Sequence, residues 1–136
     1  MNMFRIAICD DEPAICSQIE RIVLDFGRKT SHYIEVDVYF SGEELYQYLE
    51  DGPYYDIIFL DIELKKLNEI DVGRKIRSDL KNEAILIVYI SGRDSYAMEL
   101  FEVRPMHFLV KPIRTERIMT VLEKGMELSS QRPIYS

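Results

Sequence analysis

The 136-residue sequence contains no apolar run that approaches the length of a membrane-spanning helix. Such a helix needs about 20 predominantly apolar residues. The residues up to Phe4 also contain no apolar segment of signal-peptide length. We therefore expect a cytoplasmic protein that makes no contact with a membrane.

Cysteine, histidine and positive charge are also scarce. Cys9 and Cys16 form neither a CxxC pair nor a zinc-binding spacing, and His32 and His107 lie far apart in the sequence. These residues are expected to pack or to lie at the surface rather than to bind a metal, with Cys9 as a small buried residue. The 17 basic residues are outnumbered by 24 acidic ones, and the net charge of −7 argues against nucleic-acid binding by this segment.

Two common catalytic motifs are missing as well. The sequence has no glycine-rich GxxxxGK loop followed by serine or threonine, which excludes a P-loop nucleotide site. It has no serine within a GxSxG motif, which excludes the nucleophile elbow of the α/β-hydrolases.

What the chain does contain is an alternation of strand and helix patterns that suits one compact domain. Apolar residues make up 47% and charged residues 30% of the sequence, as in ordinary globular proteins. Strands are expected at residues 4–9, 34–40, 56–60, 85–90 and 108–110. Helices are expected from Pro13 to a stop at Gly27, from a capping box of Ser41 and Glu44 to about Glu50, and over residues 69–80, 95–102 and 115–128.

Five strands that alternate with five helices predict an α/β fold, a doubly wound parallel sheet with helices on both faces. The runs 57–60, 85–90 and 108–110 are apolar throughout, as expected for strands that are buried on both faces. Residues 34–40 alternate apolar and polar side chains, which is typical of an edge strand with one exposed face.

Polar side chains follow four of the expected strands: Asp10-Asp11, Asp61, Ser91 and Lys111. The carboxyl ends of parallel strands meet at one edge of a sheet, where ligands of such folds bind. Carboxylates gathered there repel one another, and a magnesium ion, which prefers oxygen ligands and is usually shared with a phosphate, relieves the repulsion. An aspartate beside such an ion can attack a phosphoryl group. The strand ends therefore predict magnesium-assisted phosphoryl chemistry.

These motifs resemble the receiver domain of two-component response regulators. The matching pieces are IAICDDEP, DIIFLDIEL, YIS and FLVKPI, and the separations of 30 residues from Asp61 to Ser91 and 20 from Ser91 to Lys111 match as well. The stretch SYAMELFEVRPMHFLVKPI is similar to the LytTR-type regulators. The resemblance covers residues 3–128 and implies a flavodoxin-like receiver fold with strand order 2-1-3-4-5.

The resemblance implies a phosphorylation-controlled signalling switch that catalyses only its own phosphorylation and dephosphorylation. Asp61 would accept a phosphoryl group from a sensor histidine kinase. Asp11 and Asp61 would ligate Mg2+ directly, together with the backbone carbonyl of Glu63, and Asp10 would act mainly through water.

Further roles follow from the same resemblance. Ser91 would be the switch hydroxyl, and Phe108 the aromatic residue that turns inward on activation. Lys111 would pair with the phosphoryl group, and the peptide bond before Pro112 would be cis. The face formed by the expected helix 95–102, the strand 108–110 and the final helix would change on phosphorylation. Its apolar residues predict a homodimer through the same face: Tyr96, Phe101, Val103, Met106 and Phe108.

The loop after the third strand departs from the family pattern. Leu64-Lys65 stands where Met-Pro is usual, and Glu69 replaces a usual glycine. We expect this loop to take an unusual path without any effect on the phosphorylation chemistry.

Residues 129–136 are expected to form a tail or the start of a linker to a missing output domain, through which DNA would be bound and transcription controlled. One alternative is a stand-alone phosphorelay receiver without an output domain. Another is a magnesium-dependent phosphohydrolase with an aspartate nucleophile, although such enzymes usually carry Asp-x-Asp, and position 63 here is Glu.

Overall fold

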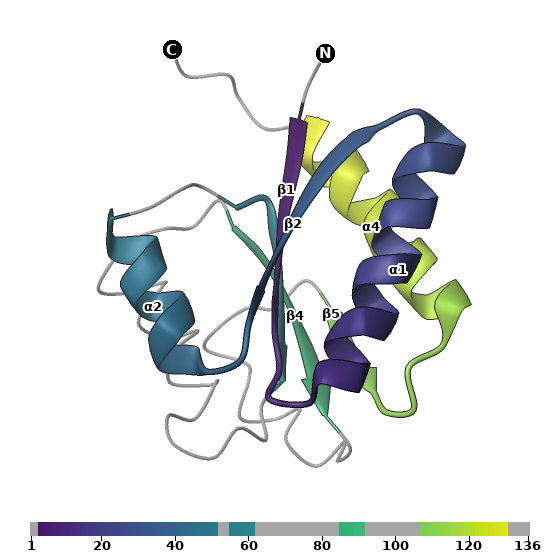
Figure 1. Ribbon diagram of the computed structural model, residues 1–136. Coiled ribbons are helices and arrows are strands. Elements are labelled where there is room, and N and C mark those ends of the chain that lie inside the picture. The colour runs from purple at the N-terminus through teal and green to yellow at the C-terminus, as the bar shows by residue number, and fades with distance from the viewer. Residues whose placement is uncertain (1–2, 52–54, 62–84, 92–106, 131–136) are drawn as a thin grey trace.

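The structure is a computed structural model that describes residues 3–51, 55–61, 85–91 and 107–130 (Figure 1). The expected helices at 69–80 and 95–102 lie outside these ranges, as do Glu63, Leu64-Lys65 and Glu69. No helix within the described ranges combines the length and the apolar character needed to cross a membrane.

Five strands form one parallel sheet in the order β2-β1-β3-β4-β5, which confirms the predicted topology. Each predicted strand is found with bounds that differ by at most one residue from those expected. The strands are β1 (Met3–Cys9), β2 (Tyr33–Tyr39), β3 (Ile57–Asp61), β4 (Leu86–Ser91) and β5 (His107–Val110).

Three helices cover the described part of the sheet: α1 (Pro13–Thr30), α2 (Gly42–Asp51) and α4 (Thr115–Ser130). Figure 1 shows α1 and α4 on one face of the sheet and α2 on the other. The alternation of side chains along each strand supplies an apolar core to both faces. In β1, Ile6 and Ile8 belong to the core under α1 and α4, whereas Ala7 and Cys9 belong to the core on the α2 side.

The start of α2 is the one expected from the sequence. The Oγ of Ser41 accepts a hydrogen bond from the backbone N–H of Glu44 at 3.1 Å. This bond satisfies one of the N–H groups that have no partner within the first turn of a helix.

The expected stop of α1 at Gly27 is wrong. The helix continues to Thr30, and Ser31 adopts the left-handed conformation at its C-terminus with a φ of 58°. The N–H of His32 returns to the carbonyl of Gly27 at 2.9 Å. A Cβ atom at Gly27 would lie 3.1 Å from the His32 carbonyl oxygen and 3.1 Å from Cδ1 of Ile34. Gly27 therefore marks a close approach between α1 and the chain that enters β2.

Candidate functional site

The acidic residues gather where β1 and β3 end. Asp10 directly follows β1, and Asp61 is the last residue of β3. The two strands are neighbours in register, with Cys9 opposite Leu60. The sheet thus brings together two carboxylates that are 51 residues apart in the sequence.

Asp10, Asp11 and Asp61 each offer a carboxylate oxygen, and these oxygens all lie within 4.8 Å of one another. Asp10 and Asp61 are buried, whereas Asp11 is exposed. Among the described residues, Asp10 Oδ2 is a buried side-chain oxygen with no hydrogen-bond partner. A hard cation with oxygen ligands and retained water fits this set, because the site is acidic inside and open to solvent at Asp11.

Lys111 completes the site from the end of β5. Its Nζ lies 3.3 Å from Asp61 Oδ2, 3.5 Å from Asp10 Oδ2 and 3.5 Å from Glu12 Oε1. Burial lowers the pKa of Lys111, but the charges of Asp61 and Asp10 outweigh it and raise the pKa above its ordinary value. The ammonium group is therefore kept charged beside the carboxylate of Asp61. The Lys111–Pro112 peptide bond is cis, as the resemblance predicts.

Asp10 is held on several sides. Its backbone N–H donates to the Tyr39 carbonyl at 3.1 Å, and its Oδ1 accepts the N–H of Glu12 at 2.8 Å. The Sγ of Cys16 donates to the Asp10 carbonyl at 3.3 Å. These contacts fix the carboxylate of Asp10 in the buried position next to Asp61.

Burial raises the pKa of Asp10 to about 7, although the N–H of Glu12 acts in the opposite direction. The charge of Asp61 raises the pKa further, and that of Lys111 lowers it. A buried carboxyl group that holds a proton this strongly is short of positive charge, which a divalent cation would supply.

The strand register gives the positions of the predicted switch residues Ser91 and Phe108 in the sheet. Ser91 ends β4, one position beyond the pair formed by Ile90 and Asp61. Phe108 lies in β5 opposite Tyr89. The Glu63 carbonyl expected to bind the metal lies outside the described residues.

Sequence reasoning missed the part played by Glu12, whose carboxylate reaches Lys111 across 99 positions of the sequence. The only local signal is its place directly after Asp10-Asp11 and before Pro13. That place sets Glu12 at the N-terminus of α1, on the same edge of the sheet as the acidic cluster.

Residues 6–123 match the family model described as the response regulator receiver domain. The chain belongs to this family. Receiver domains of response regulators are signalling proteins and generally not enzymes. They interact with sensor kinases and often dimerise.

Curated relatives of this receiver domain include two proteins named sensory transduction protein LytT. The LytT protein of Oceanobacillus iheyensis is 32% identical over 95 residues, which make up 69% of this chain and 38% of that protein. The LytT protein of Bacillus subtilis is 28% identical over 123 residues, 90% of this chain and 48% of that protein. The receiver domain therefore spans less than half the length of either relative.

Solved receiver structures share the fold. The response regulator TrrA of Thermotoga maritima, in complex with Mg2+ and a beryllium fluoride, is 25% identical with a TM-score of 0.77, and the alignment covers 90% of this chain and 99% of that chain. The response regulatory domain of MrkE from Klebsiella pneumoniae is 23% identical with a TM-score of 0.80, with 95% of this chain and 100% of that chain covered.

Proposed function

We propose that this receiver domain is a switch in which Asp61 accepts a phosphoryl group from a sensor histidine kinase. The observation that carries the proposal is the contact of Asp61 Oδ2 with Lys111 Nζ at 3.3 Å, inside a cluster that also contains the carboxylates of Asp10 and Asp11. A nucleophilic carboxylate, a fixed cation and a set of metal ligands are the parts that phosphoryl transfer to an aspartate needs.

In the proposed reaction, a carboxylate oxygen of Asp61 forms a bond to phosphorus while the bond from phosphorus to the kinase's histidine nitrogen breaks. The product is an acyl phosphate, and the electron pair of the broken bond stays with the imidazole. Lys111, already beside Asp61, balances the charge of the phosphoryl oxygens. The domain catalyses no reaction beyond its own phosphorylation and dephosphorylation.

Magnesium belongs to the same proposal. Asp11 and Asp61 would bind the ion directly with the backbone carbonyl of Glu63, and Asp10 would act mainly through water. When bound, the ion supplies positive charge to the phosphoryl oxygens and relieves the repulsion among the carboxylates. Two observations support this assignment: the buried Asp10 oxygen without a hydrogen-bond partner, and the Mg2+ in the TrrA complex.

The output of the switch is proposed to be control of transcription in the cytoplasm. The phosphoryl group would draw the hydroxyl of Ser91 toward it, and Phe108 would then turn inward. The receiver domain, residues 3–128, would pass this change through residues 129–136 to an output domain that binds DNA. Relatives named LytT, and others named transcriptional regulatory protein LytR, are longer than this chain and support that organisation.

The first test is labelling with acetyl phosphate followed by intact-mass spectrometry. The unmodified protein should gain the mass of one phosphoryl group when magnesium is present and none when a chelator removes it. Asp61→Asn keeps the side-chain size but removes the nucleophile, and it should remain unlabelled.

Asp25→Asn is the matched control, because Asp25 pairs with Arg28 on α1 rather than with the acidic cluster. It should be labelled normally. Normal labelling of Asp61→Asn would refute the assignment of the phosphoacceptor. Repeated turnover of small phosphate esters, instead of a single labelling event, would indicate a phosphohydrolase.

A further inference from the structure

The ammonium group of Lys111 is shared among three carboxylates, and one of them does not belong to the metal cluster. Glu12 Oε1 lies 3.5 Å from Lys111 Nζ, and both Glu12 and Asp61 are within hydrogen-bonding distance of it. The three carboxylate oxygens grouped as possible metal ligands come from Asp10, Asp11 and Asp61, without Glu12. The Glu12 side chain is 61% exposed, whereas that of Lys111 is only 16% exposed.

The backbone of Glu12 is held in place, which keeps its carboxylate within reach of Lys111. Its N–H donates to Asp10 Oδ1 at 2.8 Å, and its carbonyl accepts the first N–H groups of α1, from Ile15 and Cys16. Only the side chain of Glu12 is free to move toward solvent.

From this geometry we propose that Glu12 is a positioning residue that competes with the incoming phosphoryl group for Lys111, and so slows the phosphorylation of Asp61. The inference rests on the proposed function. An ammonium group has three N–H donors, and one that points at Glu12 is not available to a phosphoryl oxygen.

The expected effect is modest, because Glu12 is largely exposed and its pairing with Lys111 is weakened by solvent. Removal of the charge should speed phosphorylation by about two- to fivefold, the range that a weak exposed ion pair can supply to a rate.

The test is the rate of Asp61 labelling by acetyl phosphate at saturating magnesium, followed by intact-mass spectrometry. Glu12→Gln keeps the shape of the side chain and should be labelled about two- to fivefold faster than the unmodified protein. Glu123→Gln, on the exposed surface of α4, makes the same change in net charge and should leave the rate unchanged. Equal acceleration in Glu123→Gln would overturn the proposal, because net charge alone would explain it.

Two further measurements separate competition for Lys111 from other causes. In a Lys111→Met background, where labelling is slower, Glu12→Gln should give little or no acceleration, because no ammonium remains to be released. The second measurement is the affinity of Glu12→Gln for magnesium. Because a negative charge near the cluster is lost, this affinity should be weaker or unchanged, so the faster labelling rate cannot come from tighter metal binding.

The outcomes distinguish this inference from the function on which it rests. Labelling of the unmodified protein with an unchanged rate in Glu12→Gln would overturn the role of Glu12 alone. An equal acceleration with and without Lys111 would do the same, since it would indicate simple repulsion of the phosphodonor. A complete lack of labelling in the unmodified protein would overturn the proposed function and this inference together.

Discussion

Asp10 is a fully buried carboxyl group whose Oδ2 has no hydrogen-bond partner. Burial raises its pKa from the ordinary 3.8 to about 7, against the opposing effects of the Glu12 N–H and Lys111. The folded protein without metal therefore holds a proton on Asp10 at pH values where the unfolded chain has already released it. That difference links the protonation of one residue to the stability of the fold.

The pH dependence of stability follows from this shift. Between about pH 4 and about pH 7 the folded state binds more protons at Asp10 than the unfolded state does. The contribution of Asp10 to the free energy of unfolding therefore decreases as the pH rises through this range. Urea unfolding in the presence of a chelator should show that decrease more steeply for the unmodified protein than for Asp10→Asn. A cation that binds only the folded state stabilises it. Added magnesium should therefore raise the free energy of unfolding, and most at the higher pH, where Asp10 has lost its proton and the cluster is most negative. Identical pH profiles for the two proteins would contradict the raised pKa.

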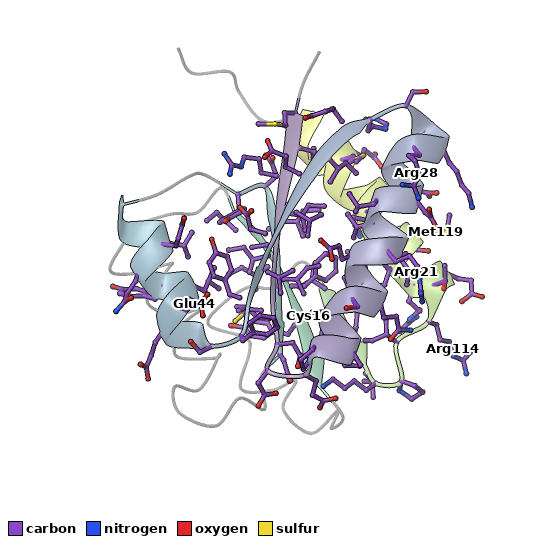
Figure 2. The ribbon with its side chains drawn as sticks, viewed as in Figure 1. Cys16, Arg21, Arg28, Glu44, Arg114 and Met119 are labelled. Carbon is purple, nitrogen blue, oxygen red and sulfur yellow. The ribbon has the colours of Figure 1, made fainter. Side chains whose placement is uncertain are left out.

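At the scale of one element, α1 connects both sides of the site. The Sγ of Cys16 bonds to the Asp10 carbonyl, and Gln18 Nε2 donates to the Ile113 carbonyl at 3.1 Å, just after Lys111 and Pro112. Figure 2 shows Cys16 on the side of α1 toward the sheet, and Arg21 and Arg28 on its outer side. The helix therefore holds the loop after β1 and the loop after β5 in fixed relation.

The Gln18 bond to Ile113 gives a test of this connection. Gln18→Glu keeps the shape but places a carboxylate oxygen against the Ile113 carbonyl, so the bond should be lost and Lys111 held less firmly. We expect about a two- to twelvefold lower labelling rate of Asp61, since a net hydrogen bond contributes about 0.5–1.5 kcal/mol. Ser17→Ala, on the exposed surface next to it, is the control and should leave the rate unchanged. A normal rate in Gln18→Glu would show that the loop is positioned without this bond.

The other end of α1 provides a stability prediction. Gly27→Ala should gain up to about 1 kcal/mol in helix propensity. The new Cβ would, however, lie 3.1 Å from the His32 carbonyl, a backbone atom that is itself tied to the helix end. Because overpacking of this kind costs about 1–3 kcal/mol, we expect a net loss of about 1 kcal/mol in the free energy of unfolding. Thermal and urea unfolding would measure it, and a more stable variant would mean that the loop shifts easily.

At the scale of the whole molecule, the sheet has the acidic cluster at the edge where β1 and β3 end, and one apolar core on each face. The core on the α2 side contains a polar network: the Tyr55 hydroxyl donates to Asp37 Oδ2 at 2.6 Å and is hydrogen-bonded to Tyr39. Tyr39 is also the residue whose carbonyl accepts the Asp10 N–H. Tyr39, at the end of β2, therefore links the core on the α2 side to the acidic cluster, through its hydroxyl on one side and its carbonyl on the other.

Self-association is the prediction for the whole molecule. We expect phosphorylation, or binding of beryllofluoride as its mimic, to favour a homodimer through the face formed by residues 95–102, β5 and α4. Of its expected apolar members, Tyr96, Phe101, Val103 and Met106 lie outside the described residues, and Phe108 lies in β5. Val110, at the end of the same strand, is 43% exposed. Sedimentation velocity over a wide concentration range should show a larger species with beryllofluoride, and Asp61→Asn should stay monomeric. An unchanged profile in the unmodified protein would count against the dimer.

The pattern of the chain alone was enough to predict the parallel sheet, its strand bounds, the start of α2 and the four strand ends that carry polar residues. Periodicity and capping are local properties, and parallel strands necessarily end at one edge, so these features follow from short segments. The meeting of the carboxylates of Asp10, Asp11 and Asp61 could be anticipated for the same reason.

Other features depend on segments that meet only in the folded protein. The role of Gly27 is set by the path of the chain into β2, and the contact of Glu12 with Lys111 joins residues that are 99 positions apart. The raised pKa of Asp10 depends on how completely its neighbours exclude water. Local pattern determines which elements form, but interatomic distances and solvent exclusion arise from the packing of those elements against one another, and only the tertiary structure supplies them.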